Sequence, residues 1–384
     1  MSTEPTTEMW HEERLLIDGE LRSAEGGATY PVENPTTGGQ LGEAADATPA
    51  DVEAALSAAR RAFDESGWAT DVDLRVRCLR QLHQALVDHA DQLTELTIAE
   101  VGAPRSACAT VQLTAPTEFL PYYAELAEGY EWTTPLGVAD TLGGPAERWT
   151  ERNPIGVVAA ITPWNVPHQI NLAKIAPALA AGCTVVLKPA PETPWCGLAL
   201  GRLVTEHTDI PAGVFNVVTS SDPAIGELLT GDPRVDMVSF TGSTATGRRV
   251  MAAASTNVTK VFLELGGKSA SIVLDDVADF GLAAATAAFG TATVAGQGCA
   301  LTTRVLLPRS RYDEGVTAIA EMMAAMAPGD PGDPGTMMGP LISDRQWQRV
   351  NEYVRGAEAA GARVVCGGGR PAALPDGHFF EMTL

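Results

Sequence analysis

Apolar residues recur every three or four positions in the first third of the chain, which is the spacing of one face of a helix. This spacing predicts one helix that begins at Pro49 and further helices at 72–89, 91–101 and 116–129. Gly–Gly and Asn–Pro pairs interrupt residues 1–47, so we expect a polar leader, short strands and turns there.

A capping pattern marks the start of the first of these helices. Thr48 is a suitable N-cap residue, Pro49 suits the first helical position, and Asp51 stands three residues after the cap. The pattern predicts a capping box between Thr48 and Asp51.

From Ile155 onward, short apolar runs rich in β-branched residues alternate with helical stretches. The runs predict strands at 155–161, 184–187, 214–218, 235–240, 261–263, 270–274, 303–307 and 363–366. The stretches between them predict helices at 168–182, 192–207, 224–230, 244–254, 279–290, 310–325 and 343–360. Nearly continuous apolar strands that alternate with helices are typical of a parallel sheet covered on both faces, so the expected fold class is α/β.

Composition and charge exclude several function classes. The chain has 384 residues, enough for two or three domains, and 48 acidic against 26 basic residues give it a net charge of −22. Because so acidic a chain repels phosphate backbones, we expect no nucleic-acid partner. Neither a signal peptide nor a run of about 18 apolar residues is readable, so we expect no membrane span and a cytoplasmic location.

The six cysteines are scattered and form no CxxC pair. This spacing argues against a disulfide scaffold and against a metal site. Cys78, Cys108 and Cys183 lie in apolar contexts and are expected to be small buried residues.

Ligands of a parallel sheet bind where its strands end, so the residues that follow each strand are candidates for chemistry. Asn165 lies between two prolines, where its amide is either an oxyanion donor or part of an ordinary turn. Lys188 is one of only four lysines and either binds a ribose hydroxyl or phosphate, or is surface decoration. Gly242 and Ser243 open a helix whose N-terminus suits a phosphate, although a plain helix cap fits equally well.

Two further residues suggest catalysis. Glu264 ends a strand beside two glycines, where it is either a general base or the partner of Lys268. Cys299 follows Gly296 and Gly298, which leave it sterically open, and it is either a nucleophile or a small structural residue.

Five segments, in this order, resemble the NAD(P)-dependent aldehyde dehydrogenase superfamily. They are TPWNVP (162–167), LKPAPETP (187–194), FTGSTATG (240–247), LELGGKS (263–269) and GQGC (296–299). Weaker similarity runs from about residue 15 to the end. The resemblance implies a Rossmann-like dinucleotide-binding domain in residues 1–130 and 155–264, oligomerisation strands in 131–154, and a second α/β catalytic domain in 265–384. It also implies a homodimer or homotetramer.

The resemblance further implies oxidation of an aldehyde to the carboxylic acid, with NAD as cofactor and NADP as the alternative. Cys299 would form the thiohemiacetal and then the thioester, Asn165 and the Cys299 N–H would hold the oxyanion, and Glu264 would activate water. Lys174 matches a lysine near the family's active site. The residues implied to bind the cofactor are Thr162, Trp164, Lys188, Gly242, Ser243 and Glu264.

Two other functions stay open at this point. One is a relative that transfers the acyl group to coenzyme A, and the other is an inactive dinucleotide-binding remnant. The presence of Glu264 favours hydrolysis, because a base that activates water fits the release of an acid.

Departures from the family pattern concern specificity. Pro191, followed by Glu192, stands where NAD-type members often carry Glu, which leaves the choice between NAD and NADP open. Val166, Ile170 and Gly298 are expected to line a roomy apolar tunnel that suits bulky aliphatic, aromatic or terpenoid aldehydes.

The chain stops at Leu384, a position that resembles the interior of the family's catalytic domain. We therefore expect a C-terminally truncated chain whose catalytic domain is incomplete. Apolar faces left uncovered by the truncation should make it poorly stable.

Overall fold

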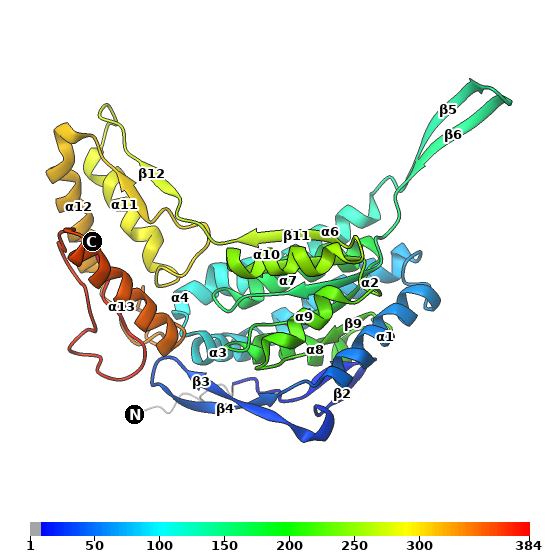
Figure 1. Ribbon diagram of the computed structural model, residues 1–384, viewed down its shortest axis with the longest axis horizontal. Helices are drawn as coiled ribbons and strands as arrows, with labels where there is room; N and C mark the ends of the chain where they lie inside the picture. Colours follow the sequence, from blue (N-terminus) through cyan, green and yellow to red (C-terminus); the bar gives the residue numbers. More distant parts are fainter. Residues whose placement is uncertain (1–8) are drawn as a thin grey trace.

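The computed structural model describes residues 9–384 and has one large sheet at its centre (Figure 1). The strand order is β11–β10–β7–β8–β9–β1–β2. The strands from β11 to β9 are parallel, whereas β1 and β2 are antiparallel additions at one edge. Their bounds are β1 (Leu15–Ile17), β2 (Glu20–Arg22), β7 (Val157–Ile161), β8 (Thr184–Lys188), β9 (Phe215–Val217), β10 (Met237–Gly242) and β11 (Lys260–Leu265). The predicted α/β class with a parallel sheet is confirmed.

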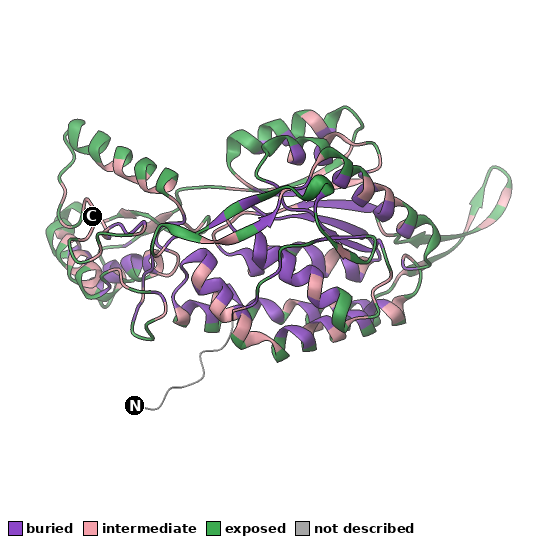
Figure 2. Cartoon of the chain, turned by 90° about the horizontal axis from the view of Figure 1, so that it is seen from below, coloured by how far each residue is buried: buried purple, intermediate pink, exposed green. Residues whose placement is uncertain are grey.

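Helices cover both faces of this sheet. On one face lie α1 (Pro49–Glu65), α9 (Pro223–Gly231) and α10 (Thr244–Ser255), and on the other lie α7 (Pro167–Ala181) and α8 (Pro194–His207). An outer layer of α2 (Val72–Asp88), α3 (Ala90–Val101) and α6 (Phe119–Glu128) packs on α7 and α8. Because both faces are covered, the strands of the sheet are largely buried (Figure 2). β8 is buried along its whole length, and its apolar residues belong to the main core.

The capping box predicted at α1 is present. The Thr48 N–H donates to Asp51 Oδ2 at 2.9 Å, and the Asp51 N–H donates back to Thr48 Oγ1 at 3.4 Å. The buried Asp51 carboxylate also accepts from the Glu25 N–H at 3.0 Å, so the cap ties the N-terminal segment to α1.

The edge strand β11 is only half covered. Its residues alternate between exposed and partly buried, and Phe262 and Glu264 are on the exposed side. The helix α10 contacts β11, which leaves the opposite face of this strand open at the end where the candidate chemistry lies.

A second, smaller unit follows β11. It contains the parallel pair β12 (Ala270–Ile272) and β13 (Arg304–Leu306), with α11 (Phe280–Ala292), α12 (Tyr312–Ala325) and α13 (Asp344–Ala359). Its core is small and includes Ala284, Ala288, Ile319, Leu341 and Phe380. Large apolar side chains of β12 and β13 stay exposed, namely Ile272 and Leu306.

The predicted strand at 363–366 is wrong. The Val365 N–H donates to the Leu384 carbonyl at 2.7 Å and the Leu384 N–H donates to the Cys366 carbonyl at 3.2 Å, but no ladder of strand pairs extends from these bonds. An apolar run forms a strand only beside another strand, and the glycines from Gly367 onward end the extended backbone.

Short elements complete the fold. A hairpin of β3 (Thr29–Asn34) and β4 (Gly39–Ala45) flanks the large sheet, and short helical turns lie at α4 (Arg105–Ala107) and α5 (Thr114–Thr117), with a π-helical turn at Cys108–Gln112 between them. Short 3-10 turns lie at Glu25–Gly27 and Arg309–Arg311.

A long hairpin projects from the body of the molecule (Figure 1). It consists of β5 (Thr133–Thr141) and β6 (Gly144–Glu151), which pair only with each other. Leu136, Val138, Leu142 and Trp149 are exposed on or beside it. A two-stranded hairpin with apolar side chains in water is marginally stable unless another surface covers it.

Candidate active site

The candidate residues gather at the carboxyl edge of the large sheet, where parallel strands present their loops. The Thr162 N–H, directly after β7, donates to the Lys188 carbonyl at the end of β8 at 3.1 Å. The loops that carry the site residues therefore start from adjacent, buried strands.

Asn165 connects the two units of the chain. Its Nδ2 donates to the Gln297 carbonyl at 2.8 Å, two residues before Cys299. The Asn165 carbonyl accepts from Gln112 Nε2 at 2.9 Å, and Gln297 Oε1 accepts from the Ile342 N–H at 3.1 Å. The amide of Asn165 is thus held beside the cysteine loop, with one of its two N–H groups used for this contact.

Cys299 is exposed, in contrast to the buried Cys78, Cys108 and Cys183. Its loop leaves α11 through Gly296, whose φ of +73° is accessible mainly to glycine, and the Gly296 N–H donates to the Thr291 carbonyl at 2.8 Å. A Cβ at Gly267, in the loop after β11, would lie 3.9 Å from the Cys299 carbonyl oxygen. The thiol loop and the loop that follows Glu264 are therefore neighbours.

Gly298, the residue before the thiol, is closely packed within its own loop. A Cβ built at Gly298 would lie 2.6 Å from Leu301 Cγ and 3.0 Å from Val294 Cγ2. The missing side chain at this position makes space for the loop's own packing, and the exposure of Cys299 comes from its place at the surface of the loop.

Glu264 shares one face of the sheet with Lys174. In the register of β10 and β11, Ser239 pairs with Phe262 and Thr241 pairs with Glu264. The buried Lys174 reaches this face from α7, donates to Ser239 Oγ at 2.9 Å and lies 6.0 Å from the Phe262 ring. Residues two apart on a strand point the same way, so Glu264 follows Phe262 on the side that Lys174 approaches.

The alternative pairing of Glu264 with Lys268 is not formed. Lys268 Nζ donates to the Gly267 carbonyl at 3.0 Å instead, and within residues 9–384 Glu264 belongs to no ion pair. The carboxylate is exposed and available to water.

Lys188 is buried, contrary to the interpretation that it decorates the surface. Burial lowers its pKa, while the charges of Glu192, Asp46 and Asp222 act in the opposite direction. The only hydrogen-bond contact of its Nζ among the described residues is a long one, 3.5 Å to the Pro189 carbonyl.

The N-terminus of α10 is exposed at the same edge. Ser243 is its N-cap and accepts from the Thr246 N–H at 3.1 Å, and the first turn holds no acidic residue. Gly242 is the last residue of β10, and a Cβ there would lie 2.6 Å from the Phe240 ring, so packing requires a glycine at this position.

Two buried hydroxyls at the edge lack a protein partner. Thr162 Oγ1 follows β7 and Thr241 Oγ1 lies near the end of β10, and neither has a hydrogen-bond partner in the part of the chain that the structure describes. Together with the poorly partnered Lys188 and the open N-terminus of α10, they provide donors for a polar ligand that runs along the strand ends. Trp164, which is partly buried, lies in the same loop as Thr162.

The other predicted tunnel residues lie on the first turn of α7 and just before it. Val166 is buried, and Ile170 is partly buried. Ala173, one position before Lys174, is exposed, so this side of α7 carries small side chains at the surface.

Several polar residues of the site region escaped the sequence reasoning. Gln112 is buried in the irregular segment before α5, and no local motif marks it. His168 and Asn171 are buried on α7, and the described residues offer no partner to their polar side-chain atoms. Burial lowers the pKa of His168 to about 4, so its ring is neutral at pH 7.

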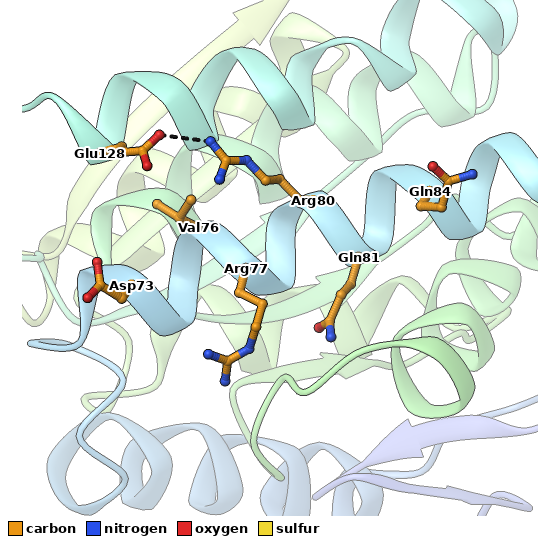
Figure 3. A pocket seen from close by; sticks show the side chains of 7 residues that line it. All are labelled: Asp73, Val76, Arg77, Arg80, Gln81, Gln84 and Glu128. Atoms are coloured by element: carbon orange, nitrogen blue, oxygen red, sulfur yellow. Dashed lines mark hydrogen bonds and ion pairs between the residues drawn. The ribbon is translucent and has the colours of Figure 1, made fainter.

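One hollow in the described part of the chain lies apart from this site. A hollow of about 500 Å³ lies along α2 and is lined by Arg77, Arg80 and Glu128 among others (Figure 3). Arg80 donates to Glu128 at 2.8 Å across it. Within residues 9–384 no three His, Cys, Asp or Glu side chains are grouped to hold a metal ion, and no helix has the length and apolar character of a membrane span.

A family model described as the aldehyde dehydrogenase family matches residues 21–384. The chain is 38% identical over 374 residues to the succinate-semialdehyde dehydrogenase [NADP(+)] of Escherichia coli, and the match covers 97% of this chain and 75% of that protein. It is 40% identical to a Mycobacterium tuberculosis aldehyde dehydrogenase solved with NAD+, at a TM-score of 0.90, covering 98% of this chain and 76% of the other. It is also 34% identical to a mutant of aldehyde dehydrogenase C from Pseudomonas syringae solved with NAD+ and octanal, at a TM-score of 0.90, covering 100% and 76%.

The buried Lys174 predicts a pH dependence of stability. Burial lowers its pKa from 10.5 to about 8, and the charge of Glu264 opposes this shift. The folded state thus binds this proton less tightly than the unfolded state, so a cost of burying the charge is present below pH 8 and fades as the pH rises from 8 to 10.5. We expect the unfolding free energy of the wild type to rise relative to Lys174→Met across this range, measured by denaturant unfolding at each pH.

The exposed Lys260 provides the matched control. Lys260→Met, measured in parallel, controls for the loss of one lysine charge at the surface. A level difference between the wild type and Lys174→Met over this pH range would contradict the prediction.

Proposed function

Because this chain belongs to the aldehyde dehydrogenase family, it is an NAD(P)-dependent oxidoreductase that oxidises an aldehyde to a carboxylic acid, and we propose that Cys299, Asn165 and Glu264 perform the chemistry. The observation that carries the assignment is the hydrogen bond from Asn165 to the Gln297 carbonyl, which brings an amide donor to the loop of the exposed thiol. Glu264 stands at the end of the neighbouring strand on the open face of β11.

In the first step, the Cys299 thiolate adds to the aldehyde carbon and forms a thiohemiacetal. The negative charge develops on the former carbonyl oxygen. The second Asn165 N–H, which the contact with Gln297 leaves free, and the Cys299 backbone N–H donate to this oxygen. A donor fixed before the reaction needs no reorganisation when the charge appears.

The residues at the strand ends fit a nicotinamide dinucleotide. We propose that Lys188 binds the adenosine ribose, that Ser243 and the N-terminus of α10 bind the pyrophosphate, and that Thr162, Trp164 and Gly242 complete the groove. The unpartnered hydroxyls of Thr162 and Thr241 support this assignment. When bound, the cofactor supplies the acceptor for the aldehyde's hydride, which leaves a thioester on Cys299.

Glu264 then acts as the general base. It takes a proton from a water molecule that attacks the thioester carbon, the C–S bond breaks, and the carboxylic acid leaves with regeneration of the Cys299 thiolate. The exposure of Glu264 and its lack of an ion pair among the described residues favour this role over transfer of the acyl group to coenzyme A. Lys174, on the same face, is placed to interact with the charge on Glu264.

The two units of the chain are proposed to have different functions. We propose residues 1–130 and 155–264 as the dinucleotide-binding domain and 265–384 as the catalytic domain. A cytoplasmic location accords with six free cysteines, of which Cys299 must stay reduced to react.

The hairpin 131–154 is proposed to join copies of this chain into a homodimer or homotetramer. Its exposed Leu136, Val138 and Trp149 would be covered by the neighbouring copy.

The substrate is proposed to be a bulky aliphatic or aromatic aldehyde. Val166 and Ile170 are apolar and Ala173 is small, and all three lie within nine residues of Asn165 on the loop and first turns of α7. The relative from Pseudomonas syringae that was solved with octanal supports an aliphatic substrate with a chain about as long as that of octanal.

Substitutions separate the proposed catalytic roles. Cys299→Ala should abolish aldehyde oxidation, and Asn165→Ala should lower kcat by about 10²–10³-fold, because it removes an oxyanion donor. Glu264→Gln should release close to one reduced cofactor per site and then stall as the acyl-enzyme, which intact-protein mass spectrometry detects. Cofactor reduction should not require coenzyme A.

The partly exposed Cys366 gives the control, since Cys366→Ala should retain full activity. Dependence on coenzyme A would favour the acylating alternative. Dinucleotide binding with no acyl-enzyme in any variant would favour the inactive remnant.

The proposed tunnel predicts chain-length selectivity. Octanal should show a kcat/KM at least tenfold above that of acetaldehyde, because each buried methylene contributes about 0.8 kcal/mol. Val166→Phe should lower kcat/KM for octanal and leave kcat for acetaldehyde unchanged, which also verifies folding. Equal kcat/KM for the two aldehydes would contradict the tunnel.

The hairpin predicts the assembly. Light scattering of the wild type should give a multiple of the 40.2 kDa chain mass, and Val138→Glu with Trp149→Glu should shift it toward the monomer. Glu147→Gln, on the same hairpin, should leave the mass unchanged. A monomeric wild type would refute this role of the hairpin.

A further inference from the structure

The surroundings of Lys188 are acidic on several sides. Lys188 ends β8, and the adjacent parallel strand β9 ends at Val217, so the loops after both strands meet at one edge. A Cβ at Gly226, in the first turns of α9, would lie 3.8 Å from Lys188 Cδ, which puts α9 alongside the lysine stem. Asp222 is the N-cap of that helix.

Asp46 brings a second carboxylate to this place. Its oxygens accept from Ser220 Oγ at 2.7 Å, from the Ser221 N–H at 3.0 Å and from Ser221 Oγ at 2.7 Å. Burial acts to raise its pKa, but these hydrogen bonds outweigh the burial and the pKa lies below its usual value. Asp46 is therefore ionised at neutral pH. It follows β4, and its hydrogen bonds hold it against the loop after β9.

Glu192 supplies the third carboxylate, four residues after Lys188. It is largely buried, with 18% of its side chain exposed, and Oε1 accepts from Arg345 Nη2 at 2.8 Å. Arg345 lies in the first turn of α13 in the second unit, with 75% of its side chain exposed. Among the charges that act on Lys188, that of Glu192 has the largest effect.

The N-terminus of α9 does not offset this negative charge in favour of a bound phosphate. The Asp222 carboxylate already accepts from the Ala224 N–H at 2.8 Å, and Pro223 at the first helical position has no N–H. A helix N-terminus binds an anion through free N–H groups and its positive dipole end, and here the helix's own aspartate neutralises both. The N-terminus of α10 has an uncharged serine cap and no acidic residue in its first turn.

We infer that this edge of the dinucleotide site selects NAD+ against NADP+, and that Glu192, Asp46 and Asp222 set the selection by repelling a phosphate on the adenosine ribose. The inference rests on the proposed role of Lys188 as the ribose-binding residue. A ribose phosphate carries a charge of about −1.5 to −2 at pH 7. The charges of three carboxylates act on this one lysine, and α9, which Asp222 caps, runs alongside its side chain. An added phosphate therefore meets a net negative field, whereas ribose hydroxyls meet hydrogen-bond acceptors.

Arg345 weakens the negative field near Lys188, because it forms an ion pair with Glu192. While Glu192 holds its guanidinium, Arg345 partly neutralises the carboxylate. Removal of Glu192 would leave an arginine free to bind the phosphate, and removal of Arg345 would leave the full negative charge of Glu192. The two substitutions break the same ion pair and should change selectivity in opposite directions.

Direct binding tests this inference. Titration calorimetry with NAD+ and NADP+, and with ADP and 2′,5′-ADP as fragments, gives the ratio of dissociation constants without turnover. The wild type should bind NAD+ at least tenfold more tightly than NADP+. Glu192→Gln should reduce this ratio about tenfold, which corresponds to about 1.4 kcal/mol. Arg345→Ala should increase the ratio several-fold.

The pair Arg202 and Glu206 on α8 is the control, because it is another arginine–glutamate ion pair, at 2.9 Å, outside the proposed site. Glu206→Gln should leave the ratio unchanged. Equal or tighter binding of NADP+ by the wild type would overturn the inference and leave the proposed oxidation intact. A shift in the same direction for Glu192→Gln and Arg345→Ala would also overturn it, because loss of the ion pair as a structural link would then explain both. Binding of neither dinucleotide would overturn it together with the proposed role of Lys188.

Discussion

The hydrogen bond between the Asn165 amide and the Gln297 carbonyl is the contact on which the site depends. It joins a loop of the large sheet to the loop that carries the only exposed cysteine among the six. Neither loop has a regular ladder of its own, so their relative position is fixed by this bond and its neighbours, in which Gln112 holds the Asn165 carbonyl and Ile342 holds the Gln297 side chain. Hydrogen bonds thus join the loops of the two units beside the exposed thiol.

The two strands that lead into the site differ in how far they are buried. β8 is closed off on both faces, and its end cannot move without exposing core residues. β11 lies at the edge and keeps one face open, so a carboxylate on it reaches water. Lys174 spans the two environments, because its stem is buried in α7 and its ammonium reaches Ser239 on β10. A buried scaffold next to an open edge is what a base that must activate water requires.

Local patterns predicted much of this arrangement. The α1 cap, the order of strands and helices and the strand-end positions of Asn165, Lys188 and Glu264 follow from spacing that the sequence displays directly. The errors occur where a remote contact decides the outcome. The run at 363–366 has strand-like residues but no adjacent strand. Gln112 and Arg345 belong to no local motif. Gln112 bonds to Asn165, 53 residues away, and Arg345 bonds to Glu192, 153 residues away.

The two helix N-termini at the carboxyl edge show how one scaffold creates opposite electrostatic environments. α10 begins at a serine and exposes a first turn without acidic residues, which stabilises an anion. α9 begins at an aspartate followed by a proline, so its positive end is neutralised within the helix itself. An edge of this kind favours the phosphates of a ligand at α10 and disfavours further negative charge near α9. In the proposed binding mode, the adenosine ribose would supply the polar partner that the described residues alone do not give to the buried Lys188.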